Sequence, residues 1–261
     1  MPWQPSQYLQ FAGERLRPAV DLLARVALEN PRTIVDLGCG AGNVTRLLGE
    51  RWPEARIVGV DNSQEMLAQA RAATRDDARY TFVAADLAQW RPDAPVDLIY
   101  SNAALHWLPD HAQVFARVAG MVAAGGVLAV QMPDNFRARS HTAIADLARS
   151  DRWRAQLASL VRDSPVAAAA DYLGWLSPWM KATDIWLTEY LQVLPARDDG
   201  DHPVAAWTKG TWLVPFMAAL KESERADFLR DYMAQLALDY PACADGRTLF
   251  PFRRLFIVAN R

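Results

Sequence analysis

The sequence feature that most constrains the fold is a glycine-rich turn in residues 33–43, Thr-Ile-Val-Asp-Leu-Gly-Cys-Gly-Ala-Gly-Asn. An apolar run ends at Asp36, and Gly38, Gly40 and Gly42 follow at alternate positions. Glycine lets the backbone turn sharply and lets a ligand lie against the main chain. The stretch therefore predicts a strand, a tight turn and the start of a helix, whose N-terminal N–H groups suit an anionic ligand group.

Strands and helices alternate after this turn. We predict further strands at 56–60, 79–85, 96–100 and 127–131, with helices at 43–51, 64–73 and 109–122. The helix that ends near Ala73 follows Asn62-Ser63, an N-cap signal. Strands that alternate with helices at this spacing indicate βαβ units and an α/β fold with a parallel sheet.

Acidic or polar side chains follow the first four predicted strands, at Asp36, Asp61, Asp86 and Asn102. Open α/β sheets bind ligands at the carboxyl ends of their strands. One aspartate after a strand is commonplace: Asp36 alone could brace the loop, and Asp86 alone could be a turn residue. Their recurrence in successive units indicates a ligand site at this edge.

The spacing of the glycines selects the cofactor. A nicotinamide site favours G-x-G-x-x-G, with the pyrophosphate on the helix end. Here the spacing is G-x-G-x-G with Asp36 two residues before it, which resembles the D-x-G-x-G-x-G pattern of S-adenosylmethionine (SAM) enzymes. SAM has no phosphates, but its amino-acid tail carries a carboxylate and an ammonium. The turn and helix end are expected to take the carboxylate, and nearby acceptors the ammonium.

The other strand ends are assigned to the remaining parts of SAM. Asp61 is expected to accept hydrogen bonds from the ribose hydroxyls, and Asp86 to bind the adenine amino group. Asn102 is expected to lie beneath the methionine part. The predicted cofactor contacts are Asp36, Gly38, Gly40, Gly42, Asp61, Asn62, Asp86, Leu87, Asn102 and Ala103.

The pattern changes on either side of this alternating region. Residues 7–28 are predicted to be helical with a break at Pro18, because proline interrupts helices. After Pro133 we predict helices at 137–180, a strand at 184–193, helices at 197–250 and a terminal strand at 254–259. We expect a single domain, 1–261, with a cap formed by 1–30 and the helical insertions 137–180 and 197–250.

Several stretches resemble the trans-aconitate 2-methyltransferase family. They are Tyr8–Phe11, Glu14–Ala19, Asp21–Leu23, Ser101–His111, Gln131–Asn135, Asp184–Trp186 and Arg254–Ala259. The resemblance implies a seven-stranded, Rossmann-like class I methyltransferase sheet with helices on both faces and a helical cap. It also implies SAM-dependent methyl-ester formation on trans-aconitate, a small tricarboxylate, with S-adenosyl-L-homocysteine as product.

A carboxylate acceptor removes the need for a general base, because it is already ionised near pH 7 with an ordinary pKa of about 4. No catalytic residue is therefore predicted, and rate enhancement is expected from alignment and exclusion of water. Each candidate for the acceptor pocket could instead serve packing or lie at the surface. The candidates are Tyr8, Arg15, His106, His141, Trp207 and Arg254.

The chain departs from the family at Trp212-Leu213-Val214-Pro215, where relatives usually read Gly-Leu-Arg-Pro. Losing a guanidinium would weaken anion binding if Val214 faces the pocket. Two alternatives therefore stay open. One is methylation of another small acid or natural product. The other is a SAM-binding protein without transferase activity.

Composition narrows the remaining classes. The net charge of −2 and pI near 6.1 argue against nucleic-acid binding by general phosphate attraction. Two cysteines, Cys39 and Cys243, allow neither a disulfide framework nor a cysteine-based zinc cluster, and no metal is predicted. We expect a cytoplasmic protein without a secretory signal, a membrane span or a membrane partner. Its oligomeric state is left open.

Overall fold

The structure, a computed structural model, describes residues 12–75 and 77–261, with side chains from Leu16 onward except at position 76. The described chain separates into two compact units. We call residues 13–133, 165–188 and 254–261 the sheet unit, and residues 134–164 and 189–253 the helical unit. The prediction of a single domain with a cap stays a prediction.

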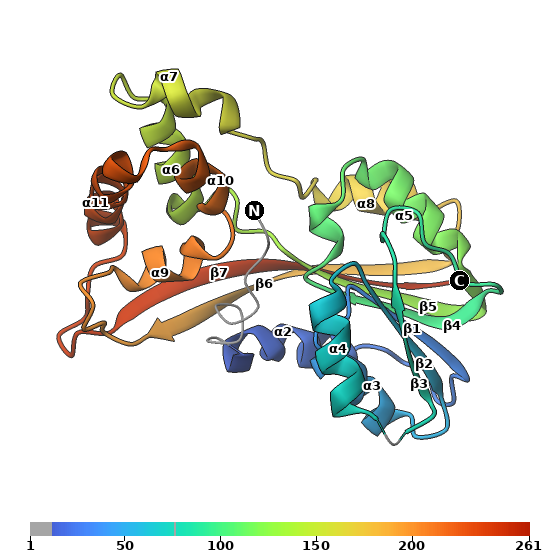
Figure 1. The fold of residues 1–261 in the computed structure, drawn as a ribbon. Coiled ribbons are helices and arrows are strands. Elements are labelled where there is room, and N and C mark those ends of the chain that lie inside the picture. The colour runs from blue at the N-terminus through green and yellow to red at the C-terminus, as the bar shows by residue number, and fades with distance from the viewer. Residues whose placement is uncertain (1–11, 76) are drawn as a thin grey trace. The chain divides into compact units, whose positions relative to one another are not determined.

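Within the described residues, seven strands form one mixed sheet in the order β3-β2-β1-β4-β5-β7-β6, which confirms the predicted fold class (Figure 1). The first five strands pair in parallel, and β7 runs antiparallel to β5. The strands are β1 (Thr33–Leu37), β2 (Arg56–Asp61), β3 (Tyr80–Ala84), β4 (Val96–Asn102), β5 (Val122–Pro133), β6 (Ala182–Leu194) and β7 (Thr248–Asn260).

Helices cover both faces of the sheet unit (Figure 1). They are α2 (Ala12–Ala24), α3 (Asn43–Arg51), α4 (Gln64–Ala73), α5 (His111–Gly120) and α8 (Ala169–Leu176), with a 3-10 turn η1 (Leu105–Trp107). Local signals explain their starts. Ser63 caps α4 by accepting from Met66 N, and Asp110 caps α5 by accepting from Gln113 N. In the interior of the sheet, β1 and β4 are nearly continuous buried runs, as expected for parallel strands covered on both faces.

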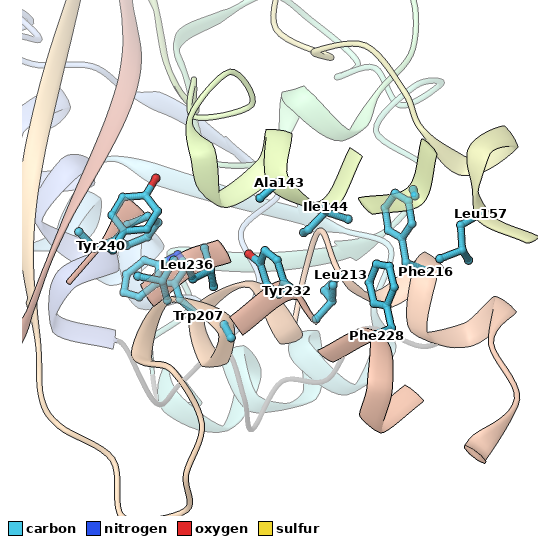
Figure 2. Packing of buried hydrophobic residues seen from close by; sticks show 14 of the residues in the cluster. Ala143, Ile144, Leu157, Trp207, Leu213, Phe216, Phe228, Tyr232, Leu236 and Tyr240 are labelled. Atoms are coloured by element: carbon cyan, nitrogen blue, oxygen red, sulfur yellow. The ribbon is translucent and has the colours of Figure 1, made fainter. Parts of the chain in front are cut away.

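The helical unit has a hydrophobic core of its own (Figure 2). Its elements are α6 (Arg139–Arg149), α7 (Arg154–Leu157), η2 (Ala158–Leu160), α9 (Pro203–Lys209), α10 (Val214–Ala219) and α11 (Glu222–Asp239). On α11, Phe228, Tyr232 and Leu236 recur every four residues and are buried together. The unit therefore holds together around its own core.

Three boundaries differ from the predictions. Pro18 lies inside a continuous α2 and does not break it, because burial of Ala19, Leu22 and Leu23 holds the helix. β5 begins at residue 122 and passes through a register shift near Gly125, whose φ of 79° accommodates the bulge. β7 begins at residue 248, so the helical region ends earlier than expected.

The predicted helical insertion 137–180 is divided between the units. Its first helices, α6 and α7, lie in the helical unit, whereas α8 lies in the sheet unit along α5. A buried pair, His111 Nδ1 and Tyr172 Oη at 2.6 Å, joins α5 to α8. None of the described helices combines the length and the apolar character that a membrane span requires.

Candidate functional site at the carboxyl ends of the strands

The glycine-rich turn after β1 adopts backbone conformations that require glycine. Gly38, Gly40 and Gly42 have φ values of 78°, 53° and 77°. A Cβ on Gly38 would lie 2.1 Å from Ala104 Cβ, and one on Gly42 would lie 3.0 Å from Ala70 Cβ. The first glycine thus lets the turn approach the segment after β4, and the third lets α3 approach α4.

The amide groups of the turn are used within the protein. Gly38 N and Cys39 N donate to Val60 O at 2.8 and 3.1 Å, and Gly40 N donates to Asp61 Oδ2 at 2.9 Å. These bonds tie the turn to the end of β2. These three amides already have acceptors within the protein, and the expectation that the turn and the helix end take the carboxylate of a ligand stays a prediction.

Asp61 shapes the turn as well as facing the strand ends. Its Oδ2 accepts from Gly40 N, and its Oδ1 accepts from Ser63 N at 2.9 Å. Each carboxylate oxygen has two lone pairs, so both can accept a further bond. Contacts of Asp61 and the exposed Asn62 with a ribose stay predictions.

Asp36 lies in the interior, with 1% of its surface exposed. Thr45 Oγ1 donates to its Oδ2 at 2.7 Å. Burial raises the pKa of Asp36 from its ordinary value to about 7; the Thr45 hydrogen bond opposes this rise and the charge of Asp61 adds to it. Asp36 is therefore close to half-ionised at neutral pH, and its direct contact with a cofactor stays a prediction.

Asp86 and Leu87 follow β3 beside the turn. Asp86 is exposed, and its Oδ1 accepts from Ala88 N at 2.8 Å, which leaves its other oxygen for a ligand. Leu87 Cδ1 lies 3.5 Å from the position of a Cβ on Gly38. The structure thus brings together the ends of β1, β3 and β4, as the sequence predicts, while the adenine contacts stay predictions.

The segment after β4 is strained and incompletely hydrogen-bonded. Ala103 has a φ of 53°, a left-handed conformation that alanine rarely adopts, and its N–H donates to Gln131 O at 2.9 Å. Asn102 lies in register with Gln131 on β5. Within the described residues, Asn102 Oδ1 and Gln131 Nε2 are buried without a hydrogen-bond partner. Such atoms call for an explanation, of which a bound ligand is one.

A buried positive charge adjoins the side chain of Gln131. Arg254 on β7 is 4% exposed, and its Nη1 donates to Gln131 Oε1 at 3.2 Å. Burial, together with the charge of Arg254, lowers the pKa of His106 to about 3. His106 is therefore neutral at pH 7 and offers an anion no charge, whereas Arg254 does.

Gln131 was not among the predicted site residues, although it begins one of the stretches that resemble the family. It follows the apolar run Val127–Val130 at the buried end of β5. A polar residue at the end of an apolar strand, at the ligand-binding edge of the sheet, is the signal that could have found it.

The other predicted acceptor contacts lie elsewhere. His141 belongs to the helical unit, where burial lowers its pKa to about 4, so it is neutral at pH 7. Trp207 lies in the core of the same unit with its ring against Phe250 (Figure 2). Tyr8 and the side chain of Arg15 lie outside the described residues. Their roles stay predictions.

Comparison with known proteins identifies the family. Residues 34–126 match a methyltransferase domain family. The chain is 46% identical over 259 residues to a trans-aconitate 2-methyltransferase of Azoarcus sp. (strain BH72), covering 99% of both chains. The chain belongs to the trans-aconitate 2-methyltransferase family. A second member, from Streptomyces avermitilis, is 46% identical over 265 residues, covering 99% of this chain and 97% of its own.

A solved structure supports the family fold. The YcgJ protein from Bacillus subtilis superposes with a TM-score of 0.61 at 15% identity, covering 94% of this chain and 98% of that chain. At this identity the likeness concerns the fold alone.

Trp212, where the family resemblance predicts glycine, packs against other aromatic rings in the helical unit. The Trp212 ring lies 5.0 Å from that of Phe136 and 5.4 Å from that of His141, measured between centroids. Val214 begins α10.

Proposed function

We propose that the chain is a SAM-dependent O-methyltransferase that forms a methyl ester on a carboxylate of trans-aconitate. The observation that carries the proposal is full-length similarity to proteins named trans-aconitate 2-methyltransferase, at 46% identity and 99% coverage of both chains. The buried guanidinium of Arg254 beside Gln131 supports a carboxylate acceptor, because arginine recognises carboxylates through paired N–H donors.

The residues at the strand ends fit SAM. Gly38 lets the turn approach the segment after β4, where a Cβ would meet Ala104. The side chains around it are acceptors: Asn102 Oδ1 has no partner within the described residues, and Asp36 and Asp61 are carboxyl groups. Acceptors suit a ligand that carries a sulfonium and an ammonium. When bound, SAM supplies an electrophilic methyl group on its sulfonium.

The chain's own residues then need to bind and orient the acceptor. The acceptor carboxylate is ionised at neutral pH, so no side chain has to remove a proton. Arg254 supplies the positive charge that holds the anion, and the low exposure of Arg254 and Gln131 keeps water from competing. Positioning the oxygen in line with the methyl group is the main contribution that the site makes.

The deciding experiment is a screen with labelled SAM over a panel of small carboxylic acids. We expect transfer to trans-aconitate, with the label in a base-labile ester. No transfer to any acid would overturn the proposal. Transfer to a different acid alone would retain the reaction and correct the substrate.

The cofactor assignment has its own test. Asp61→Ala should abolish SAM binding measured by calorimetry, because it removes both the ribose acceptor and the bond that holds Gly40 N. Asp97→Ala is the matched control. Asp97 also accepts from two backbone amides, Arg32 N at 2.8 Å and Thr33 N at 2.9 Å, but at the opposite ends of the strands. Unchanged SAM affinity in Asp61→Ala would contradict the assignment.

A further inference from the structure

The amide of Gln131 is fixed in one orientation at the carboxyl edge of the sheet. Its Oε1 accepts from Arg254 Nη1 at 3.2 Å, so Nε2 is the end that points elsewhere. In the part of the chain that the structure describes, Nε2 is buried and has no hydrogen-bond partner. An unsatisfied buried donor costs about 1–3 kcal/mol, so an acceptor atom is expected at this point.

The surroundings determine the charge of that acceptor. The side chain of Gln131 is 0% exposed and that of Arg254 is 4% exposed, so a positive charge and a neutral donor share a dry environment. The backbone register pairs Pro133 with Arg254, which brings β7 alongside the end of β5. A buried donor on a side chain that itself binds a buried guanidinium lies in positively charged surroundings, which favour an anionic oxygen as its partner.

We propose that Gln131 is a specificity-determining residue of the acceptor site, where its Nε2 donates a hydrogen bond to one carboxylate of the acceptor beside Arg254. The inference rests on the proposed function, since it takes the acceptor to be a carboxylic acid. The neutral amide of Gln131 would orient the carboxylate by a hydrogen bond without adding a second positive charge. It therefore selects a carboxylate without holding the anion as tightly as a second guanidinium would.

Two substitutions separate the hydrogen bond from the charge. Gln131→Met keeps the volume and removes the donor, and it should raise KM for trans-aconitate about tenfold with a smaller change in kcat. Gln131→Glu is nearly isosteric and places a carboxylate against Arg254. It should raise KM about a hundredfold, because it repels the acceptor and neutralises the guanidinium. SAM affinity, measured by calorimetry, should change less than about twofold in both variants.

The control is the same change at the other buried glutamine of the described chain. Gln192 on β6 is 6% exposed and belongs to the helical unit, whereas Gln131 belongs to the sheet unit. Gln192→Met also removes a buried amide, so it reproduces a loss of stability without altering the acceptor site. It should leave KM for trans-aconitate unchanged.

Dicarboxylic acids that lack one carboxylate of trans-aconitate separate a binding role of Gln131 from a purely structural one. Itaconate, glutaconate and mesaconate each lack a different carboxylate of trans-aconitate. Their binding to wild type and Gln131→Met is measured by calorimetry with S-adenosylhomocysteine present. The tenfold penalty should vanish for the acid that lacks the carboxylate bound by Gln131 and persist for the other two.

The outcomes separate the two levels of the proposal. If wild type neither binds nor methylates any carboxylic acid, the proposed function fails and this inference fails with it. If wild type methylates trans-aconitate but the Gln131 variants keep its KM, only the role of Gln131 is overturned. An equal penalty for every truncated acid also overturns it, because that pattern reports a general structural defect.

Discussion

The sheet unit and the helical unit treat their buried polar groups differently. In the sheet unit, Asn102 Oδ1 and Gln131 Nε2 are buried and lack partners within the described residues, and the neighbouring Ala103 is strained. Across its described residues, the helical unit contains no buried side-chain atom of this kind. Buried polar groups of the helical unit, among them Asn135, Ser140 and Tyr232, take part in hydrogen bonds within it.

A hydrogen-bond network in the helical unit links Asn135, Ser140, His141 and Tyr232. Asn135 Oδ1 accepts from Arg253 N, which turns Asn135 Nδ2 toward Ser140 Oγ at 3.4 Å. Ser140 Oγ also forms a hydrogen bond with His141 Nδ1 at 3.0 Å, which joins the histidine to the network. Tyr232 Oη completes the network by donating to Ser140 O at 2.7 Å.

We interpret this difference as the difference between a proposed ligand site and a structural network. Both regions bury polar atoms, so burial alone does not identify function. Satisfied groups stabilise a fold, whereas strain and unsatisfied atoms persist only where something else offsets their cost. The following predictions test whether the two regions respond to mutation and pH as this distinction requires.

The largest effect is expected at Gly38 in the sheet unit. Gly38→Ala would place a Cβ 2.1 Å from Ala104 Cβ at a φ of 78°, and it should destabilise the protein by about 3–5 kcal/mol and abolish SAM binding. Denaturant unfolding and calorimetry measure the two effects.

Gly125→Ala is the matched control for Gly38→Ala. Gly125 has nearly the same φ, 79°, but a Cβ there would meet no atom within 4 Å. It should cost only about 1–2 kcal/mol and preserve SAM binding. Equal losses in the two variants would show that backbone strain, and not the approach of the turn to the segment after β4, explains the glycine.

In the helical unit, the buried His141 should make the free energy of unfolding depend on pH. Burial lowers the pKa of His141 from 6.5 to about 4 in the folded chain. The unfolded chain therefore binds a proton at His141 below pH 6.5, whereas the folded chain binds it only below about pH 4. The stability contribution is complete above pH 6.5 and is lost as the pH falls toward 4, by about 3 kcal/mol.

His141→Phe removes this titration and keeps a ring in the same place. Unfolding by denaturant at pH 7.5 and pH 4 should show wild type losing about 3 kcal/mol more than the variant over that interval. An identical loss in both proteins would show that His141 is protonated as readily in the folded chain as in the unfolded one.

A smaller loss is expected from one hydroxyl of the network. Tyr232→Phe removes the donor to Ser140 O and the contact with Thr208 Oγ1 at 3.1 Å, so it should cost about 2 kcal/mol. KM and kcat for methyl transfer should stay unchanged at temperatures where the variant is folded. Tyr100→Phe, which removes a buried hydroxyl bonded to Ala19 O in the sheet unit, is the matched control. A selective change in KM with Tyr232→Phe would place the network at the acceptor.

The glycine-rich part of the candidate site could be predicted from the sequence. The strand, turn and helix around Gly38 were predictable because their residue types are tied to local geometry, and Ser63 capped α4 as predicted. Gln131 was not predicted as a site residue, because its role depends on Arg254, more than a hundred residues away in the sequence. It also depends on which atom of the Gln131 amide lacks a hydrogen-bond partner in the described structure. The predicted helix break at Pro18 was wrong, because burial of the neighbouring apolar residues outweighs the tendency of proline to interrupt a helix. Long-range pairing and competing packing energies are absent from local patterns.

The smallest predicted effect concerns the buried carboxyl group of Asp36. The pKa of Asp36 is raised to about 7, and a cation bound nearby should favour its ionised form. Binding of the cation should therefore cause Asp36 to release a proton. SAM affinity should therefore fall about tenfold between pH 8 and pH 6, as Asp36 becomes protonated in the free protein. Calorimetry in two buffers of different ionisation enthalpy counts the protons released. Asp36→Asn accounts for the titration of the SAM amino group itself. An equal pH dependence in wild type and Asp36→Asn would show that Asp36 serves only to hold Thr45, which would place it with the satisfied groups of the fold and not with the ligand site.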